Sequence, residues 1–179
     1  MKIEQQVLRF AQDDNVEILG EGAVLVNSGN RIFSNVATTV LPLFYGVVAA
    51  AGDLNGDGRD DVVISSPGDQ TLELYYGQSD GTFSLASILY TAEGVGGLAV
   101  GDFDGDGRLD IAAGLMLAQQ AVIFFNLGNG QFSWSFFASG ADTVAMTAAD
   151  LNHRGKKDLL IANFGLDFRP PNENVIFHK

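Results

Sequence analysis

Residues Gly52 to Asp61 read GDLNGDGRDD, and this short stretch combines four aspartates, one asparagine and three glycines. Aspartates this close repel one another, and glycine loses more conformational entropy on folding than any other residue. Something must offset both costs. Two explanations fit: a bound cation that neutralises the aspartates, or solvation of an exposed turn.

The same stretch recurs along the chain. AGDLNGDGRDDVVI returns as VGDFDGDGRLDIAA and then, in a degenerate form, as AADLNHRGKKDLLI. The leading aspartates Asp53, Asp102 and Asp150 are separated by 49 and 48 residues. Three copies in register indicate a repeat protein rather than an isolated motif.

Each repeat contains hydrophobic segments of 5 to 8 residues, such as VVISSPG and AVIFFNLG, bounded by Gly, Asn, Asp or Ser. The turns SDGTF and GNGQF supply the Asp-Gly and Asn-Gly pairs that favour hairpins. No segment shows sustained helical periodicity. We therefore predict an all-β chain of β-propeller-type blades, each with four antiparallel strands, in about four blade-like repeats of which the last is incomplete. A β-sandwich, the main alternative, does not account for a loop that recurs at this period.

The predicted organisation is a single propeller-type domain over residues 1–179, with blade-like units at approximately 1–42, 43–93, 94–141 and 142–179. The first unit is a weaker copy whose acidic loop is reduced to Asp13 and Asp14. Small residues in VVAAAGD and GLAVGD suit the crowded inner strand around a central channel.

Composition and charge exclude several classes of protein. Asp and Glu number 22 against 10 Lys and Arg, for a net charge of −12, which disfavours nucleic acid and anionic membranes as partners. There is no cysteine, so disulfides and thiolate metal sites are excluded. The uncharged run Asn35–Gly52 is interrupted by Pro42 and Gly46, so we expect two β-like pieces and no membrane span.

The acidic loop has the ligand pattern of a hard cation. Side-chain oxygens stand at positions 1, 3, 5 and 9, and a main-chain carbonyl at position 7 follows a glycine that permits a sharp turn, Gly58 or Gly107. An Asp/Gly-rich turn without metal is the alternative, but two matched loops favour Ca²⁺; Mg²⁺ would demand stricter octahedral geometry. The predicted ligands are Asp53, Asn55, Asp57, Arg59 and Asp61 in the first loop, and Asp102, Asp104, Asp106, Arg108 and Asp110 in the second, each arginine through its main-chain carbonyl.

The loops differ from an EF-hand, which needs a Glu at position 12 and flanking helices. Position 12 is Ile64 in the first loop and Ala113 in the second, and a strand is expected after each. The EF-hand is therefore excluded, and the aspartate at position 9 is expected to close the site with water.

The third loop departs from the pattern. It keeps Asp150, Asn152, Gly155 and Asp158 but has Arg154 at position 5, where a guanidinium repels a cation. We predict that this loop is metal-free, with Arg154 paired to Asp150 and Asp158. The chain should then bind two Ca²⁺ ions rather than three.

The stretches DLNGDGRDDVVISSPG and DFDGDGRLDIAAG resemble the FG-GAP (or VCBS) repeats of integrin-like β-propellers, and the resemblance extends from about Val16 onward. It implies Ca²⁺ between the first and second strands of each blade, and an extracellular or cell-surface location, although MKIEQQVLRFAQDD shows no signal peptide. Such propellers usually have about seven blades. The chain is then a fragment, a small closed ring, or part of a homo-oligomer that completes a ring; we favour completion by a second chain, or truncation.

Three function classes remain to be weighed. The histidines, His153 and His178, lie outside any nucleophile motif, and the carboxylates are already assigned as ligands, so we expect no enzyme. A propeller lectin is the alternative to a non-catalytic scaffold for protein interaction or adhesion. Its sugar-stacking aromatics would be Trp134, Tyr75 and Tyr76, but packing between blades is the favoured explanation of these residues. The partner is an unknown protein or glycan.

Overall fold

The computed structural model describes residues 20–21, 25–27, 33–35, 42–43, 48–65, 70–164 and 175–177, with side chains in 48–65 and 70–164. These residues form strands and loops, and no helix lies within them. The all-β prediction is therefore confirmed over the described part of the chain. The chain divides into two compact units, Met1–Tyr45 and Gly46–Lys179.

In the first unit, the described residues form two antiparallel pairs. Strand β1 (Gly20–Glu21) pairs with β4 (Pro42–Leu43), and β2 (Leu25–Asn27) pairs with β3 (Phe33–Asn35). Asp13 and Asp14 lie outside the described residues. That the N-terminal residues form a further, weaker copy of the repeat stays a prediction.

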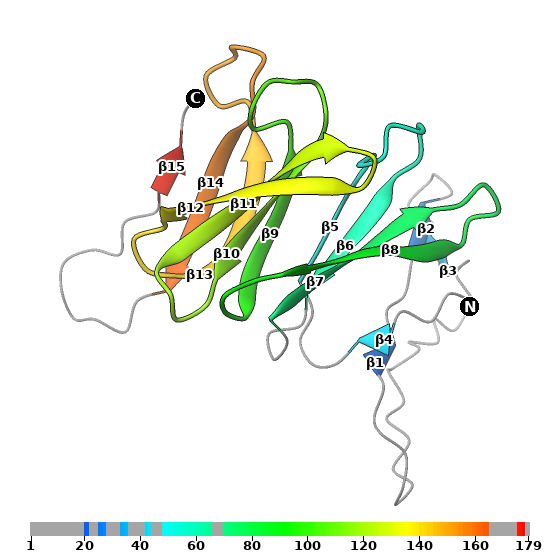
Figure 1. Cartoon of the computed structure of the whole chain (residues 1–179), viewed down its shortest axis with the longest axis horizontal. Coiled ribbons are helices and arrows are strands. Elements are labelled where there is room, and N and C mark those ends of the chain that lie inside the picture. Colours follow the sequence, from blue (N-terminus) through cyan, green and yellow to red (C-terminus); the bar gives the residue numbers. More distant parts are fainter. Residues whose placement is uncertain are drawn as a thin grey trace, which may run out of the picture. The chain divides into compact units, whose positions relative to one another are not determined.

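The second unit contains three antiparallel sheets in which each strand pairs with the next one along the chain (Figure 1). The first two sheets have four strands, as predicted, and the third has three, so the last repeat is incomplete among the described residues. These sheets lie inside the predicted units 43–93, 94–141 and 142–179. The first sheet comprises β5 (Val48–Gly52), β6 (Asp61–Ser65), β7 (Thr71–Gly77) and β8 (Phe83–Tyr90); the second comprises β9 (Val95–Gly101), β10 (Asp110–Leu115), β11 (Gln120–Gly128) and β12 (Gln131–Ala138); the third comprises β13 (Asp142–Ala149), β14 (Asp158–Phe164) and β15 (Val175–Phe177).

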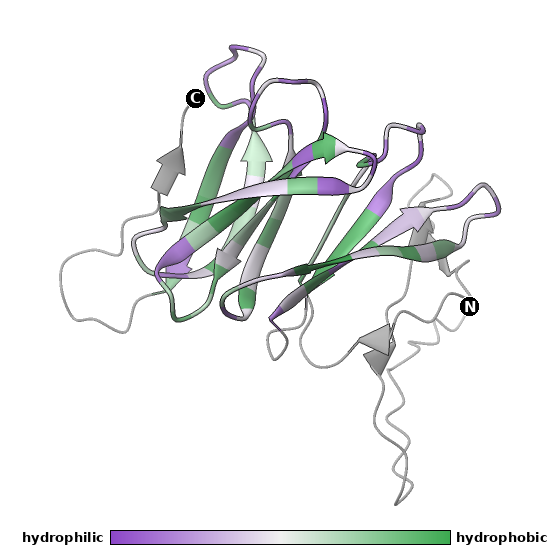
Figure 2. Ribbon diagram, viewed as in Figure 1, coloured by the Kyte–Doolittle hydropathy of each residue, from purple (hydrophilic) through white to green (hydrophobic). Residues whose placement is uncertain are grey.

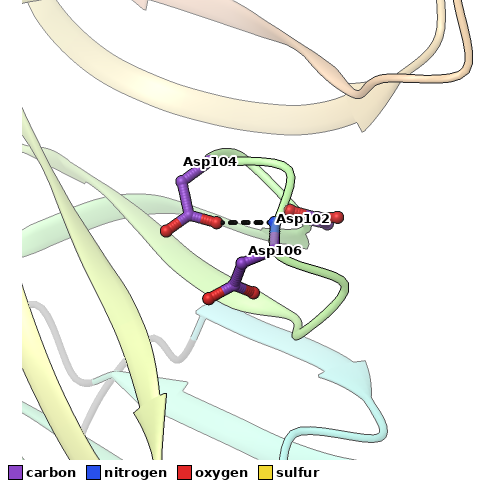
Figure 3. Close-up of side chains that lie close together, drawn as sticks. All are labelled: Asp102, Asp104 and Asp106. Atoms are coloured by element: carbon purple, nitrogen blue, oxygen red, sulfur yellow. Dashed lines mark hydrogen bonds between the residues drawn. The ribbon is translucent and has the colours of Figure 1, made fainter.

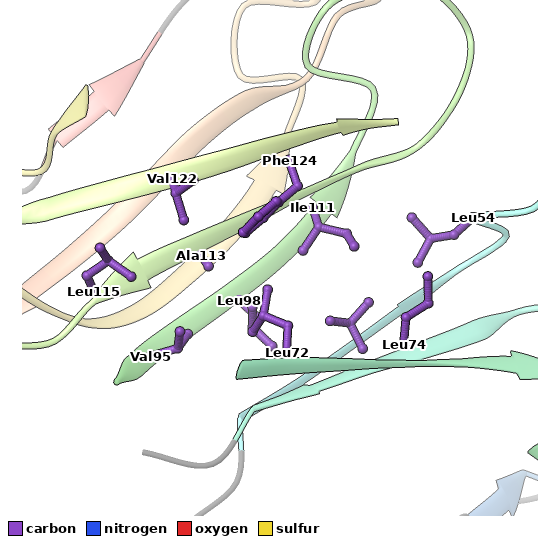
Figure 4. Close-up of a cluster of buried hydrophobic side chains, with 11 residues drawn as sticks. Leu54, Leu72, Leu74, Val95, Leu98, Ile111, Ala113, Leu115, Val122 and Phe124 are labelled. Atoms are coloured by element: carbon purple, nitrogen blue, oxygen red, sulfur yellow. The ribbon is translucent and has the colours of Figure 1, made fainter. Parts of the chain in front are cut away.

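The middle sheet has buried side chains on both faces, because successive residues of a strand point to opposite sides. On β10, Ile111 and Ala113 belong to a core cluster shared with the first sheet, whereas Ala112 belongs to a cluster shared with the third. Figure 4 shows the first cluster, in which Leu72 and Leu74 approach the side chains of the middle sheet. Full burial of an aliphatic side chain such as Leu72 contributes about 1.5–3 kcal/mol.

Small residues allow the inner strands to approach closely, as the sequence predicts. Strand β9 contacts both β5 and β13. A Cβ added to Gly96 would lie 2.0 Å from the carbonyl oxygen of Thr143, and one added to Gly114 would lie 2.2 Å from the Cγ2 atom of Thr143. Larger side chains at these positions would force the second and third sheets apart.

In each of the two four-stranded sheets, the last strand, β8 or β12, is the most exposed. On β12, Trp134 is 64% exposed, and on β8, Tyr90 is 78% exposed. Within the described residues, no helix is long and apolar enough to span a membrane.

Candidate metal centre

Three loops of nine positions each, 53–61, 102–110 and 150–158, join the first strand of each sheet to the second, and position 9 is the first residue of the second strand. They lie at the same end of the sheets (Figure 1) and are coloured as hydrophilic, whereas the strands carry most of the hydrophobic residues (Figure 2). Strands flank every loop, which confirms that none of them is an EF-hand.

The aspartate at position 9 of each loop is the first residue of the second strand and is buried. Asp61 and Asp110 are 0% exposed, and Asp158 is 1% exposed. The Oδ2 atom of Asp110 accepts the main-chain N–H of Phe103 at 2.8 Å, and its Oδ1 atom accepts that of Asn126 at 2.9 Å. This carboxylate therefore fixes the start of its loop to the hairpin that follows. Its predicted role as a metal ligand stays a prediction.

Burial changes the acidity of these carboxyl groups. Removal from water raises the pKa of Asp61 and of Asp110, and main-chain N–H donors partly oppose the rise. Both carboxylates accept main-chain hydrogen bonds on each of their oxygens. These hydrogen bonds offset the free-energy cost of burying each charged carboxylate, and only an acceptor group can form them.

The aspartate at position 1 organises the turn itself. In the second loop, Asp102 accepts the N–H of Gly105 at 2.6 Å through Oδ1 and the N–H of Gly107 at 3.0 Å through Oδ2. Asp53 accepts N–H groups from Gly56, Asp57 and Gly58 in the same manner. These bonds require left-handed backbone, with φ of 84° at Gly105 and 91° at Gly107, which glycine adopts without steric strain.

The second loop gathers three aspartates around one point. One carboxylate oxygen from each of Asp102, Asp104 and Asp106 lies within 4.8 Å of the other two (Figure 3). Asp104 also accepts the N–H of Asp106 at 3.0 Å, the bond drawn in Figure 3. In the first loop, Asn55 stands in place of Asp104 and likewise accepts the N–H of Asp57, at 2.9 Å. In the second loop, the structure thus brings together the ligands predicted at positions 1, 3 and 5.

The arginine at position 7 has a side-chain role that the sequence analysis missed. The Nε–H of Arg108 donates to the carbonyl oxygen of Asn126 at 2.6 Å, and its guanidinium pairs with Asp106. Arg59 makes the matching bonds to Gly77 and Asp57. The signal available in the sequence was that an arginine occupies position 7 of both loops. Each guanidinium partly compensates the negative charge of its loop and ties it to the following hairpin.

The hairpin residues that receive these bonds were also missed. Gly77 lies 16 residues after Asp61, and Asn126 lies 16 residues after Asp110; each donates its main-chain N–H to that aspartate. The equal spacing is visible in the sequence, but a glycine and an asparagine do not identify themselves as equivalent residues. Only the pairing of strands shows that the two positions are equivalent.

The third loop has the same backbone with a different charge. The N–H of Leu151 donates to Asp158 at 2.9 Å, and the N–H of Gly155 donates to Asp150 at 2.8 Å. The hydrogen bond from Gly155 is the main cause that lowers the pKa of Asp150. Two aspartates against one arginine and two lysines give this loop a formal charge of +1. Four aspartates against one arginine give each of the other two loops −3.

The predicted pairing of Arg154 differs from what the structure shows. The main-chain N–H of Arg154 donates to Asp150 at 3.0 Å, and the side-chain amide of Asn152 donates to Asp158 at 3.2 Å. Among the described residues, the guanidinium of Arg154 forms no ion pair. The side-chain amide of Asn152, at position 3, is the group that meets the buried aspartate.

The second loop fits a hard divalent cation, and the first loop has the same pattern of predicted ligands. Their predicted ligands are all oxygen atoms, three carboxylates of the second loop converge within ligand range of one point, and the excess of negative charge favours a cation. Calcium accepts six to eight oxygen ligands in flexible geometry, so water can complete such a shell.

The aromatic residues proposed for sugar stacking lie in different surroundings. Tyr75 is 6% exposed, and its hydroxyl donates to Glu73; burial raises the pKa of this hydroxyl well above its usual range. Tyr76 is half-buried beside a cavity of about 660 Å³ that Asp53 and Arg108 also line. Trp134 is exposed on β12. His178 lies outside the described residues, and His153 is an exposed residue of the third loop.

Residues 53–113 match the family model of the FG-GAP-like repeat. The matched segment contains the first two loops and ends inside β10, so the third loop lies beyond it. The predicted resemblance to FG-GAP repeats is confirmed over this segment. No curated protein matches the chain.

Proposed function

We propose that this chain is a calcium-binding scaffold of β-propeller-type repeats that serves protein interaction or adhesion and has no catalytic activity. The observation that carries the proposal is the convergence of Asp102, Asp104 and Asp106 in a loop matched by the FG-GAP-like repeat family. FG-GAP repeats often bind calcium. In this proposal the two loops of charge −3 each hold one Ca²⁺ ion, and the loop of charge +1 holds none.

The function of the metal in this proposal is structural. A loop of nine residues with four aspartates is under electrostatic repulsion that a divalent cation relieves. Its ends are fixed to the sheet through the buried position-9 aspartate and the position-7 arginine. A bound cation would therefore make the loop end of the sheets rigid, and this end is the surface that the scaffold presents to a partner.

Thermal unfolding with and without a chelator tests the calcium claim. At a free Ca²⁺ concentration 100-fold above its Kd, each site stabilises the folded chain by about 2.7 kcal/mol, or about 5–10 °C in the unfolding midpoint. We expect EDTA, which removes the ions from both sites, to lower the midpoint by about twice this amount, and an excess of Ca²⁺, but not the same concentration of Mg²⁺, to restore it. A midpoint that EDTA leaves unchanged would refute the calcium claim.

A partner surface for another repeat is supported by the residue at position 2 of the loops. Leu54 and Phe103 are 5% and 7% exposed because each packs in a core cluster shared with the next sheet. Their counterpart Leu151 is 44% exposed. We infer that a further repeat, supplied by a second copy of the chain, covers Leu151 in a completed ring. Light scattering should give a mass above that of one chain, and Leu151→Asp should return it to that of one chain; a monomeric wild type contradicts the inference.

An exposed tryptophan favours glycan binding as a second candidate function. Trp134 is 64% exposed on an outer strand, and an indole ring of this kind can stack on a sugar ring. Glycan-array screening of the intact chain, repeated with Trp134→Ala, tests it. Saturable binding that is lost in the variant supports a lectin, and the absence of any binding leaves the protein scaffold.

A further inference from the structure

Asn126 connects the two calcium loops through a buried side chain. It is 2% exposed, near the end of β11, and its Nδ2 group donates to the carbonyl oxygen of Leu54 at 2.7 Å. The same amide donates to the carbonyl oxygen of Leu109 at 3.0 Å, and its Oδ1 atom accepts the N–H of Gly128 at 2.9 Å. The bond to Leu54 joins residues 72 positions apart in two different repeats.

At one end of this connection, Leu54 belongs to the first loop. It stands between the predicted ligands Asp53 and Asn55, and its N–H donates to the buried Asp61 at 2.9 Å. Its side chain is 5% exposed and packs among the core residues labelled in Figure 4. The peptide groups on either side of Leu54 therefore cannot shift without disturbing both the first loop and the core.

At the other end, Asn126 supports the second loop through its main chain. Its N–H donates to Asp110 at 2.9 Å, and its carbonyl oxygen accepts the Nε–H of Arg108 at 2.6 Å. Arg108 in turn pairs with Asp106, a predicted ligand. A continuous series of bonded groups thus runs from Asp61 through Leu54 and Asn126 to the ligands of the second loop.

The first repeat shows that the two main-chain bonds from the hairpin to the loop do not need an asparagine side chain. Gly77 is the equivalent residue, and its main chain makes the same two bonds, to Asp61 and Arg59. A Cβ at Gly77 would lie 2.4 Å from the carbonyl oxygen of Asp60, so no side chain fits there. The amide of Asn126 is therefore an addition of the second repeat, and it bonds both its own loop, at Leu109, and the neighbouring loop, at Leu54.

We propose that Asn126 couples the two loops, so that Ca²⁺ in one loop raises the affinity of the other. This inference rests on the proposed calcium binding. A cation in the first loop orders the peptide groups of Asp53, Leu54 and Asn55, and this fixes the carbonyl that Asn126 needs. The second loop then loses less conformational entropy when it binds its own ion, which is positive linkage and must be reciprocal. Repulsion between the two ions acts in the opposite sense but does not depend on Asn126.

Calorimetric titration with Ca²⁺ tests this in a cycle of variants. Asp53→Asn combined with Asp57→Asn disables the first loop while keeping the side-chain shapes. We expect the Ca²⁺ affinity of the second loop to fall by about fivefold or more in this variant, the usual lower range of linkage between coupled sites. When Asn126→Ala is present in both chains of the comparison, the fall should be less than twofold.

A control separates the coupling from the loss of a side-chain amide in a hairpin. Gln78 occupies the corresponding hairpin of the first repeat, and its amide donates only to Tyr76 and Ser84 of that hairpin among its described hydrogen bonds. Gln78→Ala should leave the fivefold factor unchanged. A reciprocal measurement needs no change at Asn126: Asp104→Asn with Asp106→Asn should weaken the first loop by the same factor.

The outcomes separate the two proposals. If the intact chain binds two ions, but each loop has the same affinity when the other loop is disabled, the coupling is overturned and calcium binding stands. A linkage that persists in the Asn126→Ala background would overturn the assignment to Asn126. An intact chain that binds no Ca²⁺ would overturn both.

Discussion

The second and third loops share the same backbone conformation but carry net charges of opposite sign. In both, the position-1 aspartate accepts the N–H of the glycine at position 6, at 3.0 Å in the second loop and 2.8 Å in the third. In both, the buried position-9 aspartate accepts the N–H of position 2, at 2.8 and 2.9 Å. Yet the formal charges of the two loops are −3 and +1.

This difference teaches that the turn and the cation site are encoded by different residues. Positions 1, 6 and 9 build the turn through main-chain hydrogen bonds, and they are retained in all three loops. The turn requires left-handed backbone at position 4 even where no glycine is present. His153 adopts a φ of 58° there, at the position that Gly105 occupies in the second loop. Positions 5 and 8 account for most of the difference in charge, because the third loop has Arg154 and Lys157 there, so the turn keeps its backbone whatever the charge of the loop. The predictions below test this separation.

The largest effect is expected at the position-9 aspartate, with or without metal. Asp110→Ala leaves the buried N–H groups of Phe103 and Asn126 without their acceptor, which should lower the free energy of unfolding by about 2–4 kcal/mol. Urea unfolding in excess EDTA measures this term alone. Asp158→Ala in the third loop should cost a similar amount, since its carboxylate is equally buried. A large cost in one loop and none in the other would break the shared-turn interpretation.

Next in size is the loss of metal-dependent stability from the second loop. Asp104→Asn with Asp106→Asn should abolish the stabilisation of about 2.7 kcal/mol that one site provides at 100-fold excess over Kd. The comparison of unfolding in Ca²⁺ and in EDTA isolates this contribution. Asp150→Asn is the matched control in the third loop, and there the difference between Ca²⁺ and EDTA should equal that of the wild type.

A smaller gain is expected from repairing the third loop. Arg154→Asp supplies the missing oxygen ligand at position 5 and changes the charge of this loop from +1 to −1. We expect a third, weaker Ca²⁺ site that adds about 1.4 kcal/mol at tenfold excess over its Kd. Calorimetry should then show one additional ion per chain. Arg154→Ala, which removes the repulsion without adding a ligand, should show none.

The smallest effect should come from Lys156, a third-loop residue that lies beside the second loop. Its Nζ atom is 3.8 Å from the position that a Cβ on Gly105 would occupy. Lys156→Gln should raise the Ca²⁺ affinity of the second loop by less than 1 kcal/mol, because exposed charges interact weakly in water. The gain should disappear at about 1 M salt, where the screening length is about 3 Å. An affinity gain that salt does not alter would point to a cause other than charge.

Much of the fold follows from local patterns in the sequence. The recurrence of the Asp/Gly loop placed three sheets correctly, and the Asp-Gly and Asn-Gly pairs marked the hairpins between β7 and β8 and between β11 and β12. Small residues on β9 correctly indicated a crowded inner strand, as the approach of Thr143 to Gly96 shows. These features depend on neighbours in the chain or on one repeating period.

The contacts between repeats could not be predicted, because they depend on how the sheets stack. Nothing local to Asn126 indicates that its amide reaches Leu54 in the preceding repeat. The arginines at position 7 were assigned only a main-chain role, whereas their side chains span from the loop to a hairpin 18 residues further on. Arg154 was expected to replace a metal ion, but the amide of Asn152 meets Asp158 instead.

The stoichiometry of calcium binding tests the central claim most directly. Calorimetric titration of the intact chain with Ca²⁺, with the metal content confirmed by native mass spectrometry, should give two ions per chain. Both ions should be absent from a chain that carries Asp→Asn changes in the first two loops, and the third loop should contribute none. Three ions in the wild type would contradict the role assigned to Arg154, and none would contradict calcium binding itself.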